Sequence, residues 1–221
     1  MPAAPKASPV SLTQAHAPRI IEVAKAEGVL RNQLAYILAT ARWETAHTME
    51  PVEEAFWLSD DWRRRNLRYY PHHGRGFVQI TWPANYGKAD KELGLGGRLI
   101  ANPDLALDAE IAARILVRGM MQGWFTSKKL GDYVTLAKSD FVNARRVVNG
   151  TDKAGPIAAL AEHYDDLLTE AGYGVVATPI PAPAPGSPPS VTPPTPDDPG
   201  ALMAQAIALL HRAVAALNTG A

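Results

Sequence analysis

Residues 31–54 read RNQLAYILATARWETAHTMEPVEE, and the rest of the chain is organised around this stretch. Apolar residues recur at helical spacing in its first half, which predicts a helix over about 31–47. These residues are Leu34, Ile37, Leu38 and Ala41. Glu44 falls on the edge of this apolar stripe, where a carboxylate is partly shielded from water. Such a position suits a general acid.

The second half of the stretch adds three more carboxylates. Pro51 breaks the helical pattern, with Glu50 before it and Glu53 and Glu54 after it. One acid against an apolar face and another in a polar loop is the arrangement that general acid and general base chemistry needs. The stretch by itself does not choose among the three, and a glutamate near a helix end is usually only solvated.

The bulk composition is that of a globular protein, with 221 residues of which 47% are hydrophobic and 20% charged. Because 22 basic residues balance 22 acidic ones, nucleic-acid binding by charge alone is excluded. The lack of cysteine excludes disulfides and thiolate zinc sites. Arginines are dense over residues 63–68. We interpret this run as a solvated helix face, with a site for an anionic polymer as the alternative.

Four parts are predicted along the chain. A loose N-terminus covers residues 1–10, and a helical domain covers 11–173. More than half of the 19 prolines then fall in 174–199, which predicts a semi-extended linker. Residues 200–221 return to an apolar helical pattern with a single seam. The seam consists of Met203, Ile207, Leu210, Val214 and Leu217.

The seam of the predicted tail helix suits either self-association or contact with a membrane surface. No stretch reaches the ~18 apolar residues of a membrane span, and residues 1–14 lack the apolar core of a signal peptide. We therefore expect synthesis in the cytoplasm. Action outside the cytoplasm would then require a separate pore or lysis.

Within the domain, further helices and one short extended segment are predicted. The helices span about 85–93, 108–124, 140–148 and 153–171. A helical pattern also covers 11–28, where Pro18 is expected to kink or split it. Residues 55–73 show no clean period. The alternating run at 77–81 predicts a short strand or extended segment.

The segment from residue 57 to residue 86 is rich in side chains that bind sugars. Hydrolysis of a glycosidic bond by inversion needs a protonated carboxyl and an ionised carboxylate, about 6.5–9.5 Å apart. A cleft that grips a sugar polymer also needs aromatic faces, amides and hydroxyls. The segment supplies Trp57, Tyr69, Tyr70, Gln79, Thr81, Trp82, Asn85 and Tyr86.

Four stretches together carry a specific resemblance. ETAHTMEPVEE, YYPHHGRGFVQITWPANY, ANPDLALDAEIAARILVRGMMQGWFTSKKL and FVNARRVVNGTDK resemble the family 19 chitinase-like glycoside hydrolases, in their phage and prophage endolysin branch. The resemblance covers roughly residues 10–172. It implies a mainly α, lysozyme-like fold with a deep cleft. It also implies cleavage of a β-1,4 bond next to an N-acetylated sugar by inversion, without metal or other cofactor.

The resemblance also assigns roles to single residues. Glu44 matches the general acid, and Glu54 matches the second carboxylate, with Glu53 as the near alternative. Thr81 matches a residue that helps to hold the attacking water. The candidates for substrate contacts or their immediate surroundings are Tyr70, Arg75, Gln79, Asn85, Tyr86 and Asn149. Each of these six also has a plain structural interpretation, as a turn cap, a core residue or a tie between segments.

Two departures from the family pattern are present: the first bears on how Glu44 is hydrogen-bonded, and only the second bears on the substrate. Many relatives have His before the acid, where this chain has Trp43, and the long insertion of the plant members after the acid is absent. We therefore prefer peptidoglycan to chitin as the polysaccharide partner.

Two other classes of function compete with this interpretation. A zinc hydrolase is suggested by Glu44-x-x-His47 and by the downstream pair His72-His73. However, the HExxH pattern needs a histidine where Trp43 stands, and Trp43 cannot bind a metal. The other class is a non-catalytic wall-binding module.

Overall fold

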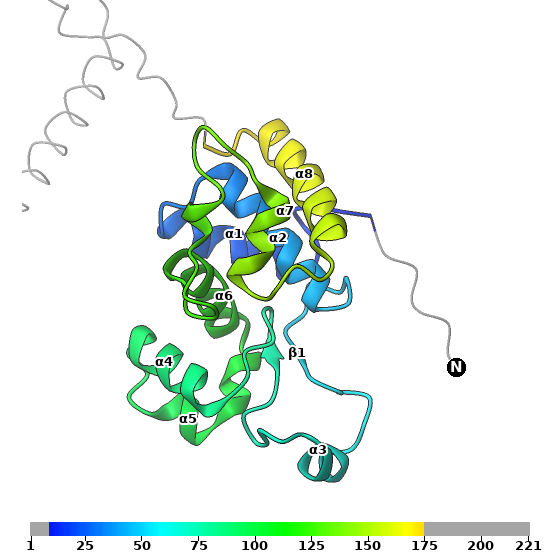
Figure 1. The fold of residues 1–221 in the computed structure, drawn as a ribbon, viewed down its shortest axis with the longest axis vertical. Helices are drawn as coiled ribbons and strands as arrows, with labels where there is room; N and C mark the ends of the chain where they lie inside the picture. Colours follow the sequence, from blue (N-terminus) through cyan, green and yellow to red (C-terminus); the bar gives the residue numbers. More distant parts are fainter. Residues whose placement is uncertain (1–8, 175–221) are drawn as a thin grey trace, which may run out of the picture. The chain divides into compact units, whose positions relative to one another are not determined.

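The computed structural model describes residues 9–174. These residues form a mainly α-helical domain with one pair of two-residue strands, which confirms the predicted fold class (Figure 1). The elements are α1 (Ala17–Ala26), α2 (Arg31–Glu44), β1 (Val52–Glu53), α3 (Asp60–Asn66), β2 (Arg75–Gly76), α4 (Pro83–Leu93), α5 (Arg98–Ala101), α6 (Ala109–Gln122), α7 (Phe141–Ala144) and α8 (Ala154–Glu170), with short 3-10 turns η1 (Pro103–Leu107), η2 (Leu130–Asp132) and η3 (Arg145–Val147). The predicted linker from residue 175 onward and the predicted helix at 200–221 lie outside the described residues.

Helix α2 forms the centre of the domain and packs along α8. Its predicted stripe is fully buried, and the burial continues around the helix from residue 32 to residue 42. A helix that is buried on all sides belongs inside a core rather than on its surface. Figure 1 shows α1, α2, α7 and α8 grouped in one part of the domain, α4 and α5 in another, and β1 between them.

Helix α2 ends at Glu44 because the Thr45 side chain caps it. The Thr45 hydroxyl donates to the carbonyl of Ala41 at 2.8 Å and accepts the backbone N–H of Met49 at 3.0 Å. These bonds turn the chain away from the helix axis. As a result Glu44 lies at the helix end.

Two of the predicted elements are wrong in detail. Residues 11–16 are not helical, and α1 begins at Ala17 with Pro18 in its first turn. There the missing N–H of proline costs nothing, so Pro18 starts the helix rather than kinking it. Residues 77–79 form a turn rather than a strand, closed by an antiparallel bridge between Arg75 and Ile80. The apolar residues of this run are buried, but not in a ladder.

Strands β1 and β2 pair antiparallel, with Val52 opposite Gly76 and Glu53 opposite Arg75. This pairing joins the carboxylate-rich segment after Pro51 to the GRG segment. Gly76 adopts φ +79°, and a Cβ there would lie 2.8 Å from the carbonyl oxygen of Ala106. Glycine is therefore required both by the backbone and by the close approach of η1. No helix in the described part of the chain is long and apolar enough to cross a membrane.

Candidate active site

Glu44 is held by an ion pair with Arg145. The Nη1 of Arg145 donates to Glu44 Oε1 at 2.7 Å, and the side chains are 5% and 19% exposed, respectively. The Nε of Arg145 donates to the carbonyl of Asp152 at 3.1 Å, which fixes the guanidinium. The carboxylate thus has a defined direction and keeps some access to solvent. Sequence reasoning missed Arg145, although it lies inside the stretch FVNARRVVNGTDK.

Glu54 is positioned by the loop that begins after β1. Its backbone N–H donates to the carbonyl of Gly74 at 2.7 Å, and its Oε2 accepts the N–H of Gly74 at 2.9 Å. Its Oε1 accepts the hydroxyl of Tyr69 at 3.1 Å. Burial, followed by the Glu54 charge, raises the pKa of Tyr69, so the phenol stays a donor. A Cβ on Gly74 would lie 2.7 Å from Gln79 Oε1, so this glycine lets the Gln79 amide and Glu54 come close.

Glu53 has a different environment from Glu54. Its Oε1 lies 2.8 Å from His73 Nε2 and accepts Arg75 Nη2 at 3.2 Å, while its Oε2 lies 3.1 Å from Arg63 Nη2. Burial lowers the pKa of His73, so the neutral ring donates to the carboxylate. Three side chains therefore occupy Glu53 and tie β1 to its surroundings. Glu54, bound only by neutral donors, is better placed to act on a water molecule.

Segments next to both candidate carboxylates line a cavity of about 210 Å³, although neither carboxylate lines it. Its lining residues are Val78, Gln79, Ile80, Thr81, Trp82, Asn85, Phe125 and Val148. On one side, Val148 directly follows η3, whose first residue pairs with Glu44. On the other side, Gln79 adjoins Gly74, which binds Glu54. One short segment on each side thus links the cavity to a carboxylate.

Four predicted residues, Gln79, Thr81, Asn85 and Asn149, line or border this cavity. Thr81 is half-buried on its wall, and its carbonyl accepts the Asn85 amide at 2.9 Å. The Gln79 amide donates to the carbonyls of Val52 at 2.9 Å and Gly76 at 3.2 Å, so it braces the β1–β2 pair. Asn149 is exposed next to Val148. Their catalytic and sugar-binding roles stay predictions.

The structure places three other predicted residues beneath the surface or at its edge. Tyr86 is fully buried and its hydroxyl donates to the carbonyl of His73 at 2.8 Å, while burial raises its pKa to about 12. The predicted direct sugar contact of Tyr86 is therefore corrected to a supporting position. Arg75 is also buried and pairs with Glu53 and with Asp104 at 3.0 Å. Tyr70 is half-buried, with its ring stacked on His73.

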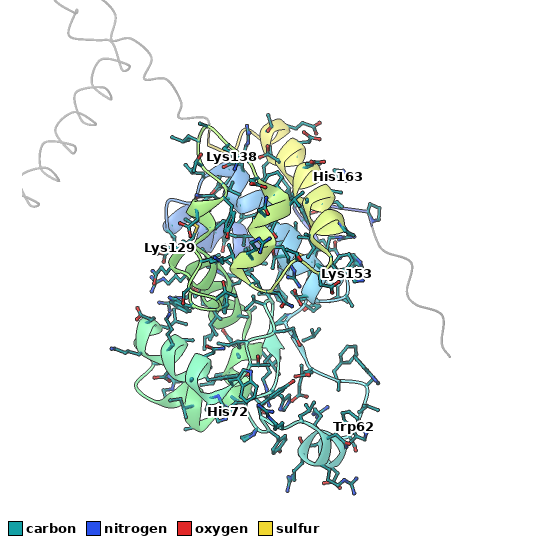
Figure 2. The ribbon with its side chains drawn as sticks, in the orientation of Figure 1. Trp62, His72, Lys129, Lys138, Lys153 and His163 are labelled. Carbon is teal, nitrogen blue, oxygen red and sulfur yellow. The ribbon has the colours of Figure 1, made fainter. Side chains whose placement is uncertain are left out.

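The histidines that suggested a metal site have separate partners. His47 packs edge-on against Trp43, His73 contacts Glu53, and His72 Nε2 lies 3.3 Å from the carbonyl of Ile100. Figure 2 shows His72 in the lower part of the view, beside α5. Within residues 9–174, no group of three histidine, aspartate or glutamate side chains is arranged to hold a metal ion.

A larger cavity of about 580 Å³ lies away from these carboxylates, next to α1 and the end of α8. Its lining is mostly apolar and glycine-rich, and Lys25 is its only charged residue among those described. Acid–base chemistry needs a proton donor and an acceptor in reach of one bond. We therefore take the smaller cavity, which lies next to the segments that bind Glu44 and Glu54, as the candidate active site.

Comparison with known proteins finds plant endochitinases. The chain is 27% identical to basic endochitinase CHB4 of Brassica napus over 157 residues, which are 66% of this chain and 54% of the relative. It is 33% identical to an endochitinase of Arabidopsis thaliana over 104 residues, covering 46% of this chain and 34% of that protein. Endochitinase EP3 of the same plant is 25% identical over 153 residues, covering 64% and 52%.

The chain is similar to plant endochitinases. It spans about half or less of the length of these relatives. No family model matches it. The similarity supports the predicted class of chemistry, whereas the endolysin branch and the polymer that is cut depend on other arguments.

Proposed function

We propose that this protein is a family 19 chitinase-like glycoside hydrolase that cleaves β-1,4 bonds next to N-acetylated sugars by inversion. The observation that carries the proposal is the pair of hydrogen-bonded carboxylates, Glu44 and Glu54, whose partners Arg145 and Gly74 lie next to segments that line one cavity. In a lysozyme-like domain, two such carboxylates are the groups that acid–base hydrolysis of a glycosidic bond requires. The similarity to endochitinases supports the same chemistry.

In the proposed reaction Glu44 gives its proton to the oxygen of the leaving sugar as the glycosidic bond breaks. Arg145 then stabilises the carboxylate that Glu44 has become. Glu54 accepts a proton from a water molecule, which attacks the anomeric carbon from the opposite face. Thr81, on the wall of the cavity, helps to orient that water.

We infer that the polymer is peptidoglycan and that the protein acts as an endolysin-type muramidase. The short loop between Glu44 and Glu54, without the insertion of plant members, supports this choice. Chitin oligomers are the alternative, favoured by the endochitinase relatives. We also propose cytoplasmic synthesis, with release to the wall through a pore or by lysis. Mass analysis of fragments from purified peptidoglycan, with the new reducing sugar identified, distinguishes the possible bonds.

The decisive variant is Glu44→Gln, which keeps the shape of the side chain but removes the proton donor. We expect turnover on peptidoglycan to fall by at least about 10³-fold, with sugar binding and thermal stability retained. Glu50→Gln is the matched control, because Glu50 is exposed and pairs only with His16, at 2.9 Å. Undiminished activity of Glu44→Gln would refute the assignment, and binding by the wild-type protein without release of reducing ends would indicate a wall-binding module.

The predicted helix at 200–221 remains a proposal of its own. We propose that its apolar seam contacts a membrane surface or a second copy of the chain. Co-sedimentation with anionic vesicles and the mass of the full chain in solution test these two partners. A full-length protein that is monomeric and does not bind vesicles would rule out both.

A further inference from the structure

Arg68 stands at the rim of the candidate active site. Its guanidinium carbon lies 5.0 Å from the centre of the Trp82 ring, and Trp82 is 41% exposed and lines the cavity. The Tyr69 ring packs against the same Trp82 ring at 4.9 Å, and the Tyr69 hydroxyl binds Glu54. A continuous run of contacts therefore leads from Arg68 to the proposed general base.

Arg68 has no carboxylate partner within the described residues. It is exposed, and its guanidinium lies over the indole ring of Trp82. Contact with an aromatic ring stabilises a guanidinium but leaves its N–H groups available for an anion. Arg68 is thus a cation that is held in place and still able to bind a carboxylate.

The neighbouring arginines of α3 bind other groups of the protein. Arg63 is buried and pairs with Glu53 and Asp60. Arg64 pairs with Asp60 at 3.4 Å and lies over the Tyr70 ring. Arg65 uses its Nε on a carbonyl of its own helix, at 3.1 Å. Of these four arginines, Arg68 alone contacts a ring that lines the cavity, so the local density of charge does not by itself explain its position.

We propose that Arg68 is a subsite for a carboxylate on the substrate, and that it makes the enzyme prefer an anionic N-acetylated glycan to a neutral one. This inference rests on the proposed glycosidase activity and names the substrate class. The stem peptides of peptidoglycan carry carboxylates, and the lactyl group carries one wherever its stem peptide has been removed, whereas chitin carries none. A guanidinium is opposite in charge to a carboxylate, and its N–H groups fit the two carboxylate oxygens.

The test compares kcat/KM on soluble peptidoglycan strands with kcat/KM on a neutral chitin oligomer. For Arg68→Gln we expect the ratio of the two values to fall about tenfold, the effect of one charge-assisted hydrogen bond. Arg68→Lys keeps the charge and should retain part of the preference. Arg65→Gln is the matched control, because it removes an exposed arginine of α3 without touching Trp82, and it should leave the ratio unchanged. Circular dichroism establishes that each variant is folded.

A second comparison identifies the source of the carboxylate. Removing stem peptides with an amidase takes away their carboxylates and frees the lactyl carboxylate, which the amide bond otherwise masks. If the effect of Arg68→Gln disappears on these strands, the stem peptide is the ligand; if it persists, Arg68 also accepts the lactyl carboxylate that the amidase has freed. Equal losses on peptidoglycan and on chitin oligomer would overturn the inference while leaving the glycosidase activity intact. A wild-type protein that cuts neither polymer would instead refute the proposed function.

Discussion

At the scale of single residues, Glu44 and Glu54 differ in what holds them. Glu44 is bound by a buried guanidinium, and Glu54 by a backbone N–H and a phenol. A guanidinium stabilises the carboxylate that an acid leaves behind, whereas neutral donors orient a base without neutralising its charge. The ion pair makes Arg145 a positioning residue for Glu44, which must take up a proton before it can act as the acid.

Replacing Arg145 by alanine should therefore reduce kcat by about 10²-fold or more, with a smaller change in KM. The variant should also be less stable, because losing one partner of a largely buried ion pair costs up to about 3–5 kcal/mol. Arg146→Ala is the control, since Arg146 is the exposed neighbour in the same turn. Kinetics measured well below the melting temperature separate the two effects. Normal kcat in a folded Arg145→Ala protein would contradict the role.

At the scale of elements, the β1–β2 pair determines where the second carboxylate lies. It fixes the register of Glu53 against Arg75, and Glu54 follows directly. The pair is only two residues long, so its own hydrogen bonds contribute little, and the close contact of Gly76 with η1 and the ion pairs of Glu53 hold it in place. Disturbing this contact should loosen the loop that carries Glu54.

Gly76→Ala tests that expectation, with Gly96→Ala as its matched control. Both glycines have positive φ, +79° and +65°, so alanine costs about 1 kcal/mol of backbone strain at either site. Only at Gly76 would the new Cβ meet a carbonyl, at 2.8 Å, whereas Gly96 faces open space. Urea unfolding should show that Gly76→Ala loses about 1–3 kcal/mol more unfolding free energy than Gly96→Ala. Equal losses at the two sites would show that the contact with η1 is unimportant.

At the scale of the whole molecule, the free energy of unfolding should depend on pH through His73. Burial keeps the pKa of His73 below its ordinary value of 6.5 in the folded protein, with its ring against Glu53 between Arg63 and Arg75. Between the two pKa values of His73, the unfolded chain therefore binds more protons than the folded domain does. Stability should be full above pH 6.5, fall as the pH drops below it, and level off below the folded-state pKa.

Unfolding free energies from pH 5 to pH 8 measure this effect. His73→Gln should reduce the slope, although His47, whose pKa is also lowered by burial, keeps part of it. His163→Gln, at an exposed position on α8, should leave the slope unchanged (Figure 2). A slope that is the same in wild type and His73→Gln would show that the buried histidine is not the titrating group.

The sequence by itself determined the helical class, the core face of α2 and the candidate acid. The period of Leu34, Ile37 and Leu38 is a local property, so it is visible without the fold. The second carboxylate was predicted only through the resemblance to a family, since Glu53 and Glu54 are adjacent and local pattern treats them alike.

Only the tertiary structure decided which partners these residues have. Arg145 lies 101 positions from Glu44 in the sequence, and no local pattern reports a contact over that distance. The same limit explains why 77–81 was expected to be a strand and why Tyr86 was expected to face a ligand. Alternation and residue type describe what a segment can do, whereas burial and long-range pairing determine which of those possibilities the folded chain adopts.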